Sequence, residues 1–284
     1  MLFIYRGDSF RREFANLGEV SSLLPNVNTM ALTATASKST RRAIYRSLAM
    51  KKVLLVSQSS NKSNLFYCLD SYQKDITEAF APLVIELKQK RTNTDRTIIF
   101  CRSYNSCITV YYYFKSSMGK HLSHPEGYPN LAELRMVDMY TAYTHPVVKD
   151  IILRQFQQPQ SVLRVIVTTI AFGMGLDCPN VRRIIHWGPP EDIETFIQEA
   201  GRAGRDGLPA TAKLFSAVKD GASHIDDKMR DYCKLKEGEC RRKYLLREFD
   251  SSTVEAAVLI VACKCCDLCA TKCTCQSCKK VINV

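Results

Sequence analysis

Two arginines that lie three residues apart, Arg202 and Arg205, are the side chains best suited to chemistry. They belong to the string QEAGRAGRDG at residues 198–207, where glycines allow the backbone to approach a ligand closely. A guanidinium group is permanently charged and fork-shaped, so a pair of them on a tight loop suits a transferring phosphoryl group. The string predicts a phosphate site, whereas a lone Gly-Arg pair would indicate only a solvated turn.

Cysteines form the second group of reactive side chains. The chain has 13 of them, and nine fall within the last 52 residues. No secretory signal precedes them, which favours a metal over disulfides, and four thiolates in tetrahedral positions bind Zn²⁺. The choice between Cys263 and Cys265 as one ligand is open. A second metal site or idle thiols are equally compatible with the three that follow, Cys273, Cys275 and Cys278.

The composition limits the class of protein. The 284 residues carry 40 Lys and Arg against 28 Asp and Glu, a net charge of +12, and 46% of them are hydrophobic. That apolar fraction argues against disorder, and the charge favours a polyanionic partner. The sequence has no run of 18 apolar residues, and its first residues are too briefly apolar for a signal peptide. We therefore expect no membrane span and a cytosolic or nuclear location.

Short apolar runs that alternate with helical patterns must position these groups. Strands are expected at residues 97–101, 136–140, 162–168, 183–187 and 212–215. Helices are expected around residues 76–87, 108–118 and 148–156. Continuous apolar strands separated by helices predict an α/β domain with a parallel sheet covered on both faces.

The flanking segments have a different character. A helix capped by Ser37 or Ser39 is expected to run to Leu48, and the apolar residues 53–56 predict another buried strand. Residues 218–249 are charged and helical in pattern, and a cysteine cluster follows them.

Four stretches of the chain follow one another in a specific order. They read MALTATA at 30–36, TIIFCRS at 97–103, VIVTTIAFGMGLD at 165–177 and QEAGRAGR at 198–205. They resemble motifs III, IV, V and VI of RecQ-type DNA helicases, within helicase superfamily 2. The resemblance implies a RecA-like α/β fold followed by a small helical zinc-binding subdomain. It divides the chain into a remnant of the first lobe at 1–60, a second lobe at 65–217 and the zinc-binding subdomain at 218–284.

The resemblance also assigns roles to single residues. Arg202 and Arg205 become catalytic arginine fingers that contact ATP, with Gln198 and Asp177 as further ATP contacts. The implied DNA contacts come from an N-terminal aromatic-rich loop and from motifs III to V: Phe10, Arg11, Thr33, Thr35, Arg102, Ser103, Thr168, Thr169 and Gly173. The implied zinc ligands are Cys240, Cys263, Cys266 and Cys269.

The activity implied by the resemblance is that of an ATP-dependent 3′–5′ DNA helicase acting on single-stranded and forked DNA. It would serve DNA repair or recombination, in the nucleus or, in a bacterium, the cytoplasm.

The P-loop pattern for ATP and the acidic box for Mg²⁺ are absent from the 284 residues. We therefore expect a fragment that is inactive alone, with Mg²⁺ held by the missing lobe. The alternatives are a non-catalytic nucleic-acid-binding regulator and, disfavoured by the zinc tail, an RNA helicase.

Overall fold

The computed structural model describes most of the chain in two compact units. One unit comprises residues 1–62 and 242–260, and the other comprises residues 63–241 and 261–284. The residues described within them are 19, 23, 27–33, 36–57, 61–71, 75–169, 178–216, 225–249 and 262–273. Among these, no helix combines the length and apolarity needed to cross a membrane.

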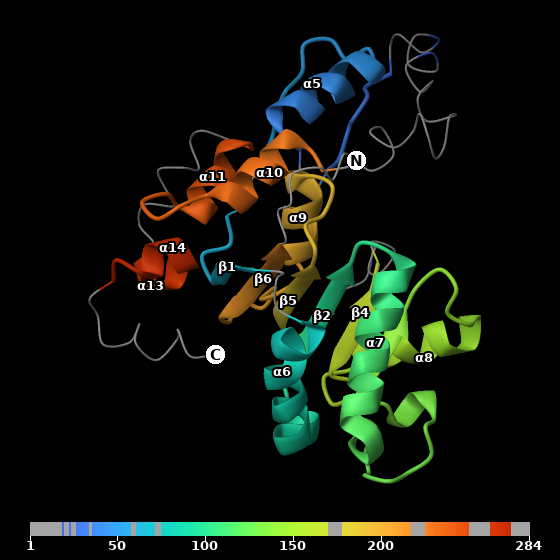
Figure 1. Cartoon of the computed structure of the whole chain (residues 1–284). Coiled ribbons are helices and arrows are strands. Elements are labelled where there is room, and N and C mark those ends of the chain that lie inside the picture. The colour runs from blue at the N-terminus through green and yellow to red at the C-terminus, as the bar shows by residue number, and fades with distance from the viewer. Residues whose placement is uncertain are drawn as a thin grey trace. The chain divides into compact units, whose positions relative to one another are not determined.

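The larger unit is built on a single six-stranded sheet (Figure 1). Its strands are β1 Leu65–Ser71, β2 Arg96–Cys101, β3 Val137–Tyr140, β4 Val165–Thr168, β5 Val181–Trp187 and β6 Ala210–Ser216. They are arranged in the order β1-β6-β5-β2-β4-β3, and every neighbouring pair is parallel. All carboxyl ends therefore meet at one edge of the sheet, and all amino ends meet at the other.

Helices cover both faces of this sheet. They are α6 Ile76–Lys90, α7 Tyr104–Met118, α8 Pro146–Gln157, α9 Ile193–Ala200 and α10 Asp227–Lys234. On one face, Phe80 of α6 packs with its ring centroid 5.5 Å from that of Phe114 in α7 and 5.0 Å from that of Trp187 in β5. On the other face, the ring of Phe196 in α9 lies 4.8 Å from that of His186. The expected RecA-like α/β architecture is thus confirmed.

The sequence predicted most of the strands correctly but not all of them. Five of the six strands are found where they were expected, but β1 was not predicted. The strand predicted at residues 53–56 is wrong, because this segment pairs with no strand of the sheet and exposes 87% of both Leu54 and Val56. Apolar character alone does not supply the neighbour that a strand must pair with.

In the smaller unit, the described residues form two helices, α5 Lys38–Ser47 and most of α11 Arg241–Arg247. Ser37 caps α5 as expected, since its hydroxyl accepts a hydrogen bond from the amide of Thr40 at 3.2 Å. The Arg41 guanidinium donates to the carbonyl of Phe249 at 2.7 Å and so links residues near both ends of this unit. Arg242 is fully buried and donates to the Asn61 side chain at 2.8 Å.

A buried arginine organises the amino edge of the sheet. Arg96, in β2, is 1% exposed, lies over the ring of Phe156 at 5.2 Å, and donates to the carbonyls of Phe156 at 2.9 Å and Pro179 at 3.2 Å. It also donates to the hydroxyl of Ser161 at 2.9 Å. Burial, followed by the charge of Arg164, lowers the pKa of Arg96 to about 10, which still leaves it charged at neutral pH. Arg96 thereby holds the segments that precede β4 and β5.

The loop after α9 is attached to the same edge. The Gly204 amide donates to the carbonyl of Val181, the first residue of β5, at 3.0 Å. The Asn64 side chain donates to the Gly204 carbonyl at 2.9 Å. The next residue of β5, Arg182, pairs with Asp206 through both carboxylate oxygens, and hydrogen bonding to Arg182 lowers the pKa of Asp206. These bonds fix the loop that carries Arg205.

We expect Gly204→Ala to destabilise the protein more than Gly207→Ala. Both glycines have positive φ, +58° and +80°, so both variants share the backbone strain of about 1–3 kcal/mol. Only at Gly204 would a Cβ lie 2.4 Å from the Asn64 Nδ2 and 2.9 Å from the Leu208 carbonyl oxygen, which adds about 1–3 kcal/mol. Urea unfolding of both variants measures the difference, and equal losses would contradict this account.

Candidate functional site at two edges of the sheet

The motif IV and motif V residues meet at the carboxyl edge of the sheet. Because β2 and β4 pair in parallel with Phe100 opposite Thr168, the residues that follow these two strands are neighbours. Arg102 and Ser103 are both exposed directly after β2. The Ser103 hydroxyl caps α7, accepting from the amide of Ser106 at 3.1 Å, whereas Arg102 is a charged group that this edge exposes.

Thr168 has a positioning part in this arrangement. Its side chain is buried, and its hydroxyl donates to the carbonyl of Tyr140, the last residue of β3, at 2.7 Å. The hydroxyl predicted to contact DNA is therefore engaged in holding the end of the neighbouring strand. Thr169, half-buried, lies directly after it.

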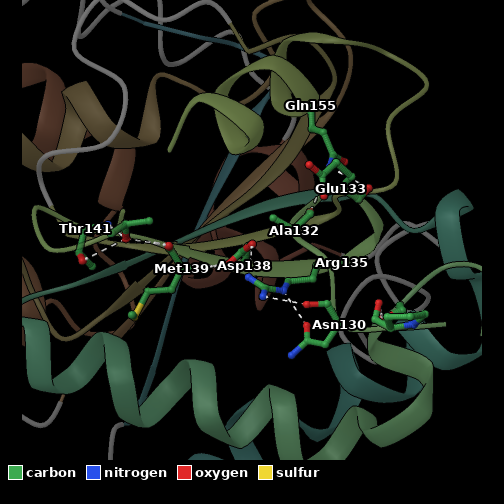
Figure 2. Close-up of polar contacts among 11 residues, drawn as sticks. Asn130, Ala132, Glu133, Arg135, Asp138, Met139, Thr141 and Gln155 are labelled. Atoms are coloured by element: carbon green, nitrogen blue, oxygen red, sulfur yellow. Dashed lines mark hydrogen bonds and ion pairs between the residues drawn. The ribbon is translucent and has the colours of Figure 1, made fainter. Parts of the chain in front are cut away.

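The turn that follows β3 is held rigidly (Figure 2). The Thr141 amide donates to the Thr144 hydroxyl at 3.0 Å, and that hydroxyl donates to the Met139 carbonyl at 3.1 Å. Earlier in β3, the Asp138 carboxylate accepts from Arg135 at 3.1 Å and from the Met139 amide at 2.8 Å. Burial raises the pKa of Asp138, and the Arg135 charge opposes this rise. Polar contacts thus fix both ends of this short strand.

The motif VI arginines lie at the opposite, amino edge. Arg202 is buried, 8% exposed, whereas Arg205 is exposed. Burial, together with the neighbouring charge of Arg205, lowers the pKa of Arg202. Gln198, half-buried in α9, precedes them. Of the two arginines predicted to act as fingers, only Arg205 presents its side chain to solvent.

A buried polar pair that was not predicted connects the two edges. His186 Nε2 and Glu199 Oε2 are 2.9 Å apart, and the two side chains are only 1% and 7% exposed. The His186 ring also stacks on Phe100, with 5.5 Å between centroids and 20° between planes. Glu199 belongs to the same string as the arginines, so the pair links the carboxyl end of β5 to the helix that delivers them. No spacing in the sequence predicts such a pair, because only the packing of the helix on the sheet brings Glu199 next to His186.

A pocket lies next to this pair at the carboxyl edge. Its volume is about 210 Å³, and Phe100, Arg102, His186, Gly188 and Glu199 contribute to its lining. Gly188 has φ +91°, and a Cβ there would lie 2.8 Å from the Arg102 side chain. The absence of a side chain at Gly188 therefore leaves room for the Arg102 side chain in the lining of the pocket.

Four cysteines gather in the same unit. The sulfurs of Cys240, Cys265, Cys266 and Cys269 all lie within 4.8 Å of one another, and those of Cys240 and Cys265 are 3.5 Å apart. The structure thus selects Cys265, since Cys263 is buried outside the cluster. Both cysteines are in the short helix α13 Ala262–Cys265, where only one of them faces the other three sulfurs. The prediction of Cys263 as a ligand is corrected in favour of Cys265.

The donor set fits a zinc ion. Zn–S bonds of about 2.3 Å in a tetrahedron place the sulfurs about 3.8 Å apart. None of these four cysteines forms a disulfide. A hydrogen bond with Cys240 raises the pKa of Cys265, and burial raises the pKa of Cys269 to about 12. Four crowded thiols become thiolates readily only when a cation compensates their charge.

The cysteine cluster is attached to the edge strand of the sheet. Cys266 forms a parallel bridge with Tyr67 in β1, and the Asp267 carboxylate accepts from the Leu69 amide at 2.9 Å. The same carboxylate accepts from Arg241 at 2.6 Å. A cation in the cluster would therefore also stabilise β1.

Of the six remaining predicted DNA and ATP contacts, the structure describes one. Thr33 is exposed and belongs to the smaller unit. Five other predicted contacts lie outside the described residues: Phe10, Arg11, Thr35, Gly173 and Asp177. The same holds for Cys275 and Cys278.

Known proteins with similar sequences match most of this chain, and those described here are DNA helicases. Residues 78–207 match the helicase conserved C-terminal domain. The ATP-dependent DNA helicase RecQ of Haemophilus influenzae is 33% identical over 216 residues, covering 76% of this chain and 31% of that protein. ATP-dependent DNA helicase hus2/rqh1 of Schizosaccharomyces pombe is 31% identical over 291 residues, covering 94% of this chain and 20% of that protein.

The relatives are much longer than the matched region. The chain spans about a third of the length of ATP-dependent DNA helicase Q-like 2 of Arabidopsis thaliana, 34%, at 29% identity over 86% of this chain. Among solved structures, S. cerevisiae Dbp5 bound to RNA and ADP BeF3 aligns with a TM-score of 0.56 at 18% identity, covering 84% of this chain and 54% of that one, and this shows a shared fold. With the six-stranded parallel sheet and the four-cysteine cluster, these matches show that the chain contains a helicase C-terminal domain and that its homologues over most of its length are RecQ-type DNA helicases.

Proposed function

We propose that this chain provides the second RecA-like lobe of an ATP-dependent 3′–5′ DNA helicase that binds single-stranded and forked DNA and unwinds the duplex. The observation that supports this most strongly is the placement of two arginine sites at opposite edges of one sheet. Arg102 lies at the carboxyl edge, where DNA phosphates would bind, and Arg205 lies at the amino edge, where ATP would bind.

Motif V would connect the two sites. It begins in β4, whose last residue Thr168 is at the carboxyl edge, and it continues toward Cys178, three residues before the start of β5 at the amino edge. The Arg96 contact with the Pro179 carbonyl anchors the far end. A change at the ATP site could reach the DNA site along this segment, as the helicase activity requires.

The part of the arginines in catalysis follows from their chemistry. Negative charge that develops on the transferred phosphoryl group would be stabilised by Arg205, a contribution on the order of 10³–10⁵ in turnover in related enzymes. Asp177 and Gln198 would contact the nucleotide. ATP phosphates and Mg²⁺ need a P-loop and an acidic box, and neither pattern occurs in the 284 residues. Those groups would come from a first lobe.

A second candidate function is a non-catalytic DNA-binding regulator. It requires only the carboxyl edge of the sheet and the four-cysteine cluster, both of which lie in the described part of the larger unit. The complete open reading frame distinguishes the two candidates. An in-frame P-loop and acidic box upstream support the helicase, whereas a stop codon at that point supports the regulator.

The four-cysteine cluster is proposed to hold one structural Zn²⁺. Cys240, Cys265, Cys266 and Cys269 would be its ligands. The ion would stabilise the connection between the cluster and β1, and no step of ATP hydrolysis would depend on it directly.

The chain alone is expected to hydrolyse ATP at the background rate. The reason is that Arg202 and Arg205 can stabilise a phosphoryl group only after other residues have bound it. Steady-state phosphate release with saturating ATP, Mg²⁺ and single-stranded DNA provides the measurement. Robust turnover that is lost in Arg205→Ala would show that the 284 residues form a complete ATP site and would contradict the proposal.

Arg102→Ala is expected to weaken binding of single-stranded DNA and to flatten its salt dependence. Loss of one phosphate contact reduces the slope of log K against log[salt] by about 0.7. Lys90→Ala is the matched control, because Lys90 ends α6 near the amino end of β2 and already pairs with Glu86 at 3.0 Å. Fluorescence anisotropy across a salt series measures both variants. An unchanged slope for Arg102→Ala would exclude Arg102 as a phosphate contact.

Zinc content is expected to separate Cys265 from Cys263. The purified chain should contain about one zinc per molecule, Cys265→Ala should lose it, and Cys263→Ala should retain it. Metal analysis by mass spectrometry gives the stoichiometry. Loss of zinc in Cys263→Ala with retention in Cys265→Ala would reverse the assignment.

A further inference from the structure

Two exposed tyrosines meet at the carboxyl edge of the sheet. Tyr104 is the first residue of α7, and Tyr143 lies in the turn between β3 and α8. Their ring centroids are 4.7 Å apart, with 58° between the planes. Tyr143 is 77% exposed and Tyr104 is 37% exposed, so neither ring is used to fill the core.

The backbone presents Tyr143 to solvent at a fixed place. Thr141 and Thr144, which flank the exposed part of the turn, are joined through the Thr144 hydroxyl. The Thr168 hydroxyl holds Tyr140 from the adjacent strand. The turn that carries the exposed ring is therefore ordered before any ligand arrives, which lowers the entropy cost of binding.

Positive charges flank the aromatic pair. Arg102 precedes Tyr104 by two residues, and Lys149 donates to the carbonyl of Ala142, next to Tyr143, at 2.8 Å. Within the part of the chain that the structure describes, neither cation forms an ion pair with a carboxylate. Exposed aromatic faces beside unneutralised cations are what a nucleic acid strand requires, because bases stack on the rings and phosphates bind the charges.

We infer that Tyr143, supported by Tyr104, is a stacking site for one base of single-stranded DNA. The inference rests on the proposed function, since it adds a base contact to an edge that is proposed to bind phosphates. The ring of Tyr143 offers its exposed face to the base, and Tyr104 packs against it from α7. Arg102 and Lys149 bind the phosphates on either side of the stacked nucleotide. Stacking of this kind is tolerant of sequence, as unwinding requires.

The test compares a strand that has bases with one that lacks them. Binding of a dT oligonucleotide and of an abasic oligonucleotide of equal length is measured at fixed salt by competition anisotropy. Tyr143→Ala is expected to weaken dT binding on the order of tenfold and to leave abasic binding within twofold. Tyr143→Phe should bind like the unchanged protein, because it keeps the ring.

Tyr128→Ala is the matched control. Tyr128 is 58% exposed but lies in the loop that precedes the amino end of β3, at the opposite edge of the sheet. Its removal should change neither oligonucleotide's affinity. Thermal unfolding of each variant verifies that the fold is intact.

The outcomes separate this inference from the proposed function. If the unchanged protein binds neither oligonucleotide, both the inference and the proposed DNA binding are wrong. If it binds dT and Tyr143→Ala binds equally well, only the stacking site is overturned, and the tyrosine pair would instead suit a protein contact. Equal losses for dT and abasic strands would also overturn it, because a stacking residue must distinguish them.

Discussion

Parallel pairing of all six strands is the constraint on which this molecule depends. Each strand enters the sheet from the same edge, so every segment that follows a strand is delivered to the carboxyl edge and every segment that precedes one lies at the amino edge. Arg102 and Tyr143 follow strands, whereas the loop of Arg205 is bonded to the first residues of β5. The sheet thereby separates a proposed DNA site from a proposed ATP site by the length of its strands.

Buried polar contacts make that separation rigid. Arg96 fixes the segments at the amino edge, and the Thr168 hydroxyl fixes the end of β3 at the carboxyl edge. Between them, the His186–Glu199 hydrogen bond attaches the helix that delivers the arginines to β5. Burying such a group without any partner costs about 1–3 kcal/mol, so packing that gives each of these side chains at least one hydrogen bond is preferred. Each site is held by bonds that also define the sheet.

The sequence predicted those features of the fold and the site that leave a pattern of apolar residues or a motif. The buried strands were predicted well, because continuous apolar runs are typical of a parallel sheet. Strand β1 was missed although residues 65–69 are continuously apolar, because this short edge strand directly follows a polar stretch that resembles a linker. Within the candidate site, the motifs predicted exposed Arg102 and Arg205. The selection of Cys265, the His186–Glu199 pair and the exposed tyrosines depends on side-chain direction, which no spacing specifies.

The central claim is that the carboxyl edge of this sheet binds single-stranded DNA. Hydrogen–deuterium exchange of the backbone, with and without a saturating oligonucleotide, tests it most directly. The account predicts slower exchange in residues 102–107 and 140–145 on addition of DNA, and no change in residues 123–131 at the amino edge. Protection confined to the amino edge, or unchanged exchange throughout residues 102–107 and 140–145 while DNA is bound, would contradict it.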